Sequence, residues 1–170
     1  MIEILKYTLP ALIVFGTVYV MLNQHFRKEL AMQNLEFQKK AIGETLPIKI
    51  QAYERLILFC DRVSPQAMIF RLNQGNMTVG GLRNSLLLAI QKEFEHNVAQ
   101  QIYISDKLWE VIETAKAEAQ QIVIKATEGL ELNQPAEKLI TNLSIVQNAL
   151  PIDPMNKAKA AIKEEVQLLL

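Results

Sequence analysis

Residues 7–22 read YTLPALIVFGTVYVML, and none of these sixteen side chains is charged. Eight of them are Leu, Ile, Val or Phe, which favour insertion into a bilayer, whereas the proline, the glycine and the two threonines partly oppose it. As a helix the run would be about 24 Å long, slightly short of a hydrocarbon core of about 30 Å. We therefore predict a membrane-spanning helix. The side chains expected to contact lipid are Tyr7, Leu9, Leu12, Ile13, Phe15, Val18 and Leu22.

Two other interpretations of this run are possible. A cleaved signal peptide needs small residues just after the apolar run, and residues 21–26 (MLNQHF) offer none. A helix buried in a protein core normally has a polar side, and this run is apolar all round. An uncleaved signal anchor is the favoured interpretation, with the buried helix and the signal peptide as alternatives.

Basic residues lie mainly after the run. Only Lys6 precedes it closely, whereas Arg27, Lys28, Lys39 and Lys40 follow within about 20 residues. Positive charge favours the cytoplasmic side of a membrane, so we expect the N-terminus outside and the C-terminal domain in the cytoplasm.

The composition suits a folded helical protein with one such helix. Of the 170 residues 50% are apolar and 21% are charged, and the 18 basic and 18 acidic residues cancel. A chain without concentrated positive charge is not expected to bind nucleic acid. The single cysteine excludes an internal disulfide and agrees with a reducing compartment.

Apolar residues recur at helical spacing along the rest of the chain, and no convincing strand is found. The fold class that we predict is all-α, a single N-terminal transmembrane helix followed by a cytoplasmic helical bundle. The expected parts are a transmembrane anchor (1–24), a juxtamembrane helix (25–46), a helical bundle domain (47–150) and a C-terminal amphipathic helix (151–170). Residues suited to cap helix N-termini are Ser64, Thr78, Ser105 and Asp153.

A long antiparallel helical hairpin is predicted inside the bundle. Its first helix would run from Thr78 to about Tyr103, and its second would begin after Ser105. In the second helix, small and apolar residues recur at alternating spacings of three and four residues. Another helix could pack closely against this row. The residues proposed for this interface are Trp109, Ile112, Ala115, Ala119, Ile122 and Ala126.

The juxtamembrane helix permits two interpretations. One row of residues predicts a short coiled-coil stalk in which a polar residue sets the register: Phe26, Leu30, Asn34, Phe37 and Ala41. A second row competes with it and favours a solvated helix with scattered contacts: Met32, Leu35 and Ile42. We expect Gly43 and Pro47 to interrupt or kink this helix.

Several strings carry a resemblance to a known family: TLPALIVF (8–15), QAYERLILFCDRVSPQ (51–66), EFEHNVAQQIYIS (93–105) and LWE (108–110). Together they resemble a small uncharacterised family of single-pass membrane proteins of Bacteroidota. The resemblance implies a protein of the bacterial cytoplasmic (inner) membrane, and it supplies no activity and no catalytic residues.

Few residues suggest chemistry. Glu93 and His96 form a Glu-x-x-His pair of the kind found in di-metal helical bundles, but the chain has no second copy, so they are only weak candidates for metal ligands. Cys60 would need a base such as His96 to act as a nucleophile, and a buried structural thiol is the favoured interpretation. Backbone donors at Gly75, Gly80 and Gly81 could bind an anion with Arg83, although a plain helix start is the default. We predict no catalytic residue and no cofactor.

The sequence therefore favours a non-enzymatic, membrane-anchored helical accessory or scaffold subunit of a bacterial membrane complex. Its expected partners are the lipid bilayer and either other subunits or a second copy of the chain. One alternative is a membrane-tethered regulator or sensor that binds a small ligand or a partner protein between helices. Another is an enzyme that uses Glu93, His96 and Cys60.

Overall fold

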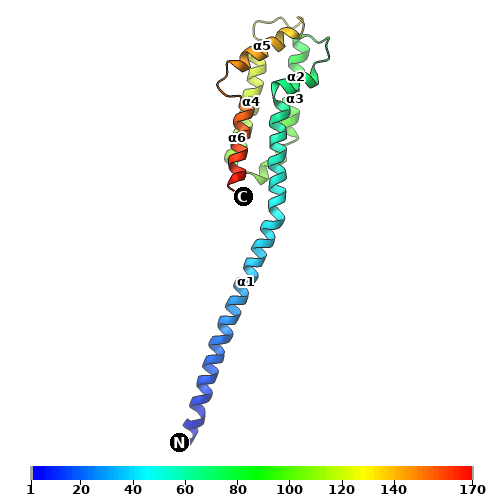
Figure 1. Cartoon of the computed structure of the whole chain (residues 1–170). Helices are drawn as coiled ribbons and strands as arrows, with labels where there is room; N and C mark the ends of the chain where they lie inside the picture. Colours follow the sequence, from blue (N-terminus) through cyan, green and yellow to red (C-terminus); the bar gives the residue numbers. More distant parts are fainter. Residues whose placement is uncertain (1, 170) are drawn as a thin grey trace. The chain divides into compact units, whose positions relative to one another are not determined.

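The computed structural model describes the backbone of residues 2–169, and their side chains except those of 2–14, 34, 38, 41 and 42. The described chain contains helices and no strand, so the predicted all-α class is confirmed (Figure 1). The elements are α1 (Ile2–Val63), α2 (Pro65–Leu72), α3 (Val79–Glu95), the 3-10 helix η1 (Val98–Tyr103), α4 (Asp106–Thr127), α5 (Glu137–Asn148) and α6 (Pro154–Gln167).

The chain divides into two units, Met1–Pro47 and Ile48–Leu170, and α1 belongs to both. The helix is continuous through Gly43 and Pro47, so the predicted interruption is wrong, while the kink that the sequence also allowed stays a prediction. A proline inside a helix forfeits one backbone hydrogen bond and strains the preceding turn. The helix beyond Pro47 is stabilised by burial of residues such as Ala52 and Leu56, which offsets that cost.

Within the part of the chain that the structure describes, no helix is both long enough and apolar enough to cross a membrane. The side chains of residues 7–14, which begin the predicted span, lie outside the part that the structure describes. Four residues predicted to contact lipid are among them: Tyr7, Leu9, Leu12 and Ile13. Phe15, Val18 and Leu22 are described, and all three are exposed.

The second unit has one apolar core, to which about the last three turns of α1 and helices α2 to α6 contribute. Helix α4 is central, because it packs against α3, α5 and α6. No charged or polar residue among the described ones is fully buried. The largest fully buried side chains are Phe59, Leu56, Met68, Leu82, Leu86, Ile90, Ile112, Leu139, Leu143, Met155, Ile162 and Val63.

Three of the four predicted N-caps are confirmed. The side chains of Thr78, Ser105 and Asp153 each accept a hydrogen bond from the first turn of the helix that follows, α3, α4 and α6 respectively. Ser64 also precedes a helix that starts with proline, but its hydroxyl donates to the carbonyl of Asp61 (2.8 Å) and does not cap α2.

The predicted hairpin is present, but its first helix is shorter than expected. Helices α3 and α4 pack against each other and run in opposite directions, with η1 between them (Figure 1). Helix α3 ends at Glu95 instead of near Tyr103. The side chain of Asn97 donates to the carbonyl of Glu93 (2.7 Å), which a continuing helix would use, and its backbone N–H donates to Phe94 instead (2.9 Å). This local competition tightens the backbone into a 3-10 turn.

Candidate functional site

The row of small and apolar residues on α4 lies inside the chain's own core. Ile112, Ala115, Ala119, Ile122 and Ala126 are buried. The helices that cover this row are α3, α5 and α6 of the same chain, so the alanines permit close packing within the bundle. The row is therefore engaged in packing within the chain and is not an exposed surface.

Trp109, the remaining residue proposed for that interface, is half-buried beside the row. Its ring stacks on Phe94, with 5.3 Å between the ring centroids, and its indole N–H donates to Glu113 (3.1 Å). The Lys116 ammonium lies 4.6 Å from the centroid of the Phe94 ring. These contacts join α3 to α4, which gives Trp109 a structural role in the hairpin.

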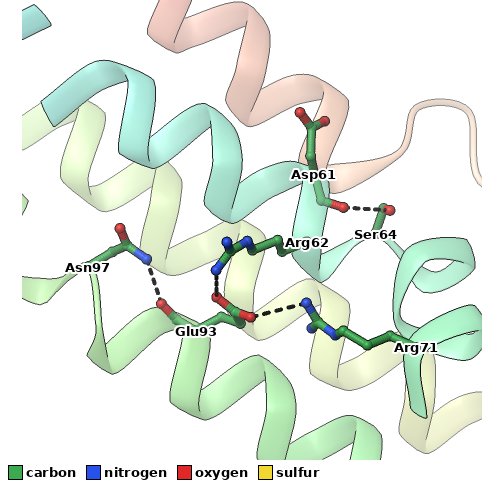
Figure 2. A network of polar contacts seen from close by, with 6 residues as sticks. All are labelled: Asp61, Arg62, Ser64, Arg71, Glu93 and Asn97. Atoms are coloured by element: carbon green, nitrogen blue, oxygen red, sulfur yellow. Dashed lines mark hydrogen bonds and ion pairs between the residues drawn. The ribbon is translucent and has the colours of Figure 1, made fainter. Parts of the chain in front are cut away.

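Glu93 is held by arginines from two other helices. Arg62 of α1 lies 3.4 Å from one carboxylate oxygen and Arg71 of α2 lies 3.2 Å from the other. Figure 2 shows both guanidinium groups directed at this carboxylate, which is only 15% exposed. Since both oxygens face cations, Glu93 is poorly placed to bind a metal ion.

His96 follows α3 directly and its side chain is exposed, while its backbone N–H donates to Lys92 (3.0 Å). Among the described residues no three His, Cys, Asp or Glu side chains form a group that could hold a metal. His96, Glu93, Asn97, Arg55 and Arg62 do line one surface pocket of about 480 Å³, together with Leu58 and Phe59. The Glu-x-x-His pair, Glu93 and His96, therefore lies in a pocket whose main charged groups are arginines.

Cys60 is fully buried in the core. Burial raises the pKa of its thiol to about 12, with Lys159 opposing the shift and Asp61 and Asp153 adding to it. The thiolate is the nucleophilic form, so this residue is unreactive at neutral pH. The predicted structural thiol is confirmed.

The glycines before and in α3 do not form an anion site. The backbone N–H of Val79 donates to the carbonyl of Gln134 (2.8 Å), and that of Gly80 donates to Leu132 (2.9 Å). The Gly81 N–H donates to the Thr78 hydroxyl (3.2 Å), and the Gly75 N–H donates to the side chain of Asn73 (3.1 Å). These donors are already engaged, so the hypothesis that they bind an anion is wrong. A Cβ on Gly80 would lie 3.3 Å from the Cβ of Leu132, so the close approach favours glycine there.

A second polar cluster, which the sequence did not reveal, surrounds Glu165 of α6. The Tyr53 hydroxyl donates to Oε1 of this carboxylate (2.8 Å), as does the Ser105 backbone N–H (2.9 Å). The Ser105 hydroxyl donates to Oε2. The cluster joins α1, the start of α4 and α6. The sequence could identify Ser105 as a helix cap, but no local pattern in it indicates that Glu165, 60 residues further along, accepts its hydrogen bonds.

The electrostatics of this cluster keep Glu165 ionised. Burial opposes ionisation, but the hydrogen bonds from Ser105 and Tyr53 and the positive charge of Lys49 outweigh it and lower the pKa of the carboxyl. Burial, followed by the hydrogen bond to Glu165 and its negative charge, raises the pKa of Tyr53 well above its usual range. Tyr53 is therefore a hydrogen-bond donor and Glu165 an acceptor at neutral pH.

Two apolar hollows lie on the surface of the second unit. One, of about 620 Å³, lies between α1 and α6 and has mainly apolar walls: Ile50, Tyr53, Ile57, Leu58, Ile162 and Val166. The other, of about 730 Å³, lies among α4, α5 and the start of α6, and includes the exposed side chains of Ile145 and Ile152. Both volumes fall within the range of roughly 300–1,000 Å³ that is usual for ligand pockets.

No curated protein and no solved structure matches the chain. A family pattern does match, and it covers residues 1–169. That family has no known function, in agreement with the resemblance to an uncharacterised family. Because the match spans almost the whole chain, the protein belongs to the family of unknown function DUF7935.

Proposed function

We propose that this chain is a non-enzymatic, membrane-anchored helical accessory or scaffold subunit of a bacterial membrane complex. In this proposal residues 7–22 cross the inner membrane with the N-terminus outside, and the second unit lies in the cytoplasm. The bundle then binds other subunits of the complex or a second copy of the chain.

The observation that carries the proposal is the row of exposed apolar side chains on the first unit of α1. Phe15 is 71% exposed, Met21 73% and Phe37 78%, and Phe26 and Leu30 are also mostly exposed. Burial of a large apolar side chain stabilises by about 1.5–3 kcal/mol. Lipid around residues 7–22 and protein around the residues that follow would provide that burial.

The charge pattern supports the same arrangement. The apolar run has no charged residue, and Arg27 and Lys28 come soon after it, as is common on the cytoplasmic side of a span. The alternative of an enzyme that uses Cys60, Glu93 and His96 is weakened, because the thiol is buried and the carboxylate is paired with two arginines.

Membrane fractionation tests the anchor. The full chain, expressed in a bacterium, should remain in the membrane pellet after washes with high salt and with alkaline carbonate. Replacing Ile13 and Phe15 together by Asp should release it, while Phe26→Asp, outside the apolar run, serves as the matched control. Wild-type chain in the soluble fraction would refute the anchor.

Cross-linking mass spectrometry on native membranes tests the scaffold role. We expect reproducible cross-links from lysines of the second unit, such as Lys125 and Lys157, to one defined set of membrane proteins or to a second copy. These two lysines border the hollow among α4, α5 and α6. A chain that is monomeric in detergent and forms no cross-links to other proteins would contradict this role.

A membrane-tethered sensor is the second candidate, and the hollow between α1 and α6 favours it. Its size and apolar walls suit a small apolar ligand. Binding of such a ligand should raise the melting temperature of the chain, and Ile57→Asp should abolish the shift. Leu88→Asp, at an exposed position of α3, is the control.

A further inference from the structure

Two arginines of α1 lie on the same side of the helix and line one pocket. Arg55 and Arg62 are seven residues apart, which is close to two helical turns. The pocket that they line has a volume of about 480 Å³ and also includes Asn97 and His96 from the end of α3. This size is suitable for a small molecule.

Positive charge exceeds negative charge at this pocket. Arg55 and Arg62 line it, and Arg71 reaches Glu93 from outside the lining. Glu93 is the only carboxylate in the lining, so the three arginines leave a surplus of two positive charges.

Three acidic residues lie close in sequence to the residues of this pocket. Asp61 pairs with Lys159 of α6 at 2.9 Å, so its charge is balanced. Glu54 and Glu95 lie outside the lining and are exposed, so solvent screens their charges. Within the described part of the chain, Arg55 has no ion pair.

A purely structural role explains only part of this arrangement. Arg62 and Arg71 each contact Glu93 and so connect α1, α2 and α3 (Figure 2). However, the Arg62 side chain is 59% exposed and its 3.4 Å contact is long, so this pair contributes little to stability. The structural role also leaves Arg55 unexplained.

We propose that this pocket binds a small organic phosphate. A phosphate monoester carries a charge of about −1.5 to −2 at pH 7, which matches the surplus. Guanidinium groups bind phosphate oxygens in a bidentate manner, which favours arginine over lysine at such a site. The exposed side chain of Leu58 provides an apolar wall for the organic part of the ligand.

Titration of the full chain with phenyl phosphate tests the proposal. With the protein in nanodiscs of phosphatidylcholine, we expect saturable binding by calorimetry, and weaker binding of inorganic phosphate, which has no organic part. Arg55→Gln and Arg62→Gln should each weaken binding about tenfold or more. Arg27→Gln, an exposed arginine of the first unit, should bind like the wild type.

Glu93→Gln provides a test in the opposite direction. The change removes the carboxylate that competes with the ligand for Arg62, so phenyl phosphate should bind more tightly. A thermal melt verifies that the variant is folded. Arg55→Gln makes the test independent of Glu93, because Arg55 has no ion pair to lose among the described residues.

Three results would overturn the proposal. They are the absence of saturable binding at about 10 mM phenyl phosphate, an equal loss of binding in Arg27→Gln and Arg55→Gln, and a folded Glu93→Gln variant that binds no better than the wild type. Among membrane lipids, phosphatidic acid presents the same phosphate monoester, whereas phosphatidylcholine is a phosphodiester. Competition by phosphatidic acid added to the nanodiscs would assign the site to lipid, and unchanged binding would assign it to a soluble ligand.

Discussion

Glu165 accepts a hydrogen bond from the backbone N–H of Ser105 at 2.9 Å, although the two residues are 60 positions apart. In a capping box, the N-cap serine bonds to the third residue of the helix, and a glutamate at that position bonds back to the N-cap N–H. Here the third residue is Leu108, which provides only its N–H to Ser105 (3.1 Å). Glu165 of α6 supplies the missing acceptor, so the start of α4 depends on the end of the chain.

We predict that Ser105→Ala lowers the free energy of unfolding by about 1–2 kcal/mol, because it removes the cap of α4 and one bond to Glu165. Urea denaturation followed by circular dichroism measures the change. Ser144→Ala is the matched control, since this exposed serine lies within α5, and its effect should be within about 0.5 kcal/mol. Equal effects of the two substitutions would contradict the prediction.

The Glu165 cluster makes stability depend on pH. Because the folded chain lowers the pKa of Glu165, its contribution is fully present above its ordinary pKa of 4.5 and is lost as the pH falls through the lower folded value. Glu165→Gln should therefore cost most stability above about pH 5.5 and progressively less below pH 4.5. Urea denaturation between about pH 3 and 7 tests this, with the exposed neighbour Glu164→Gln as the control. The same pH profile for both variants would disprove it.

Cys60 should not react with a thiol reagent in the native chain at about pH 8, because burial raises its pKa to about 12. In urea the same thiol should react completely within minutes. Ala117→Cys, at an exposed position of α4, is a positive control for accessibility of the folded protein. Stoichiometric labelling of native Cys60 would show that the core opens more readily than its packing indicates.

The alanines of α4 should not tolerate larger side chains. Ala119 is buried against neighbouring helices of the same chain, so Ala119→Leu should lower the free energy of unfolding by about 1–3 kcal/mol. Ala117→Leu on the exposed side of the same helix should change it by less than about 0.5 kcal/mol. If Ala119→Leu were as mild as its control, the buried row could not be closely packed.

The parts of the fold that depend on neighbouring residues could be predicted from the sequence. The caps at Thr78, Ser105 and Asp153 use side chains that bond within their own first turn, and the apolar row of α4 follows the helical repeat. The end of α3 was not predicted, because the Asn97 side chain competes for a carbonyl that a helical pattern assigns to the backbone.

The candidate sites depend on contacts between distant segments. The spacing of Glu93 and His96 indicates a shared helix face, but it contains no information on Arg62 or Arg71, which approach from α1 and α2. For the same reason the sequence could not show that Glu165 reaches Ser105. The predicted membrane helix is different, since it rests on the apolar composition of residues 7–22 and on the basic residues that follow them, and membrane fractionation tests it.

The connection between α4 and α5 has a practical consequence for labelling. Its carbonyls at Leu132 and Gln134 accept the first backbone donors of α3, so a tag inserted there would disturb the start of a helix more than 50 residues upstream. The turn around Gly75 is exposed, and its Gly75 N–H makes only a local hydrogen bond, to the side chain of Asn73 (3.1 Å). A reporter intended to leave the bundle intact therefore belongs in the turn at residues 74–76.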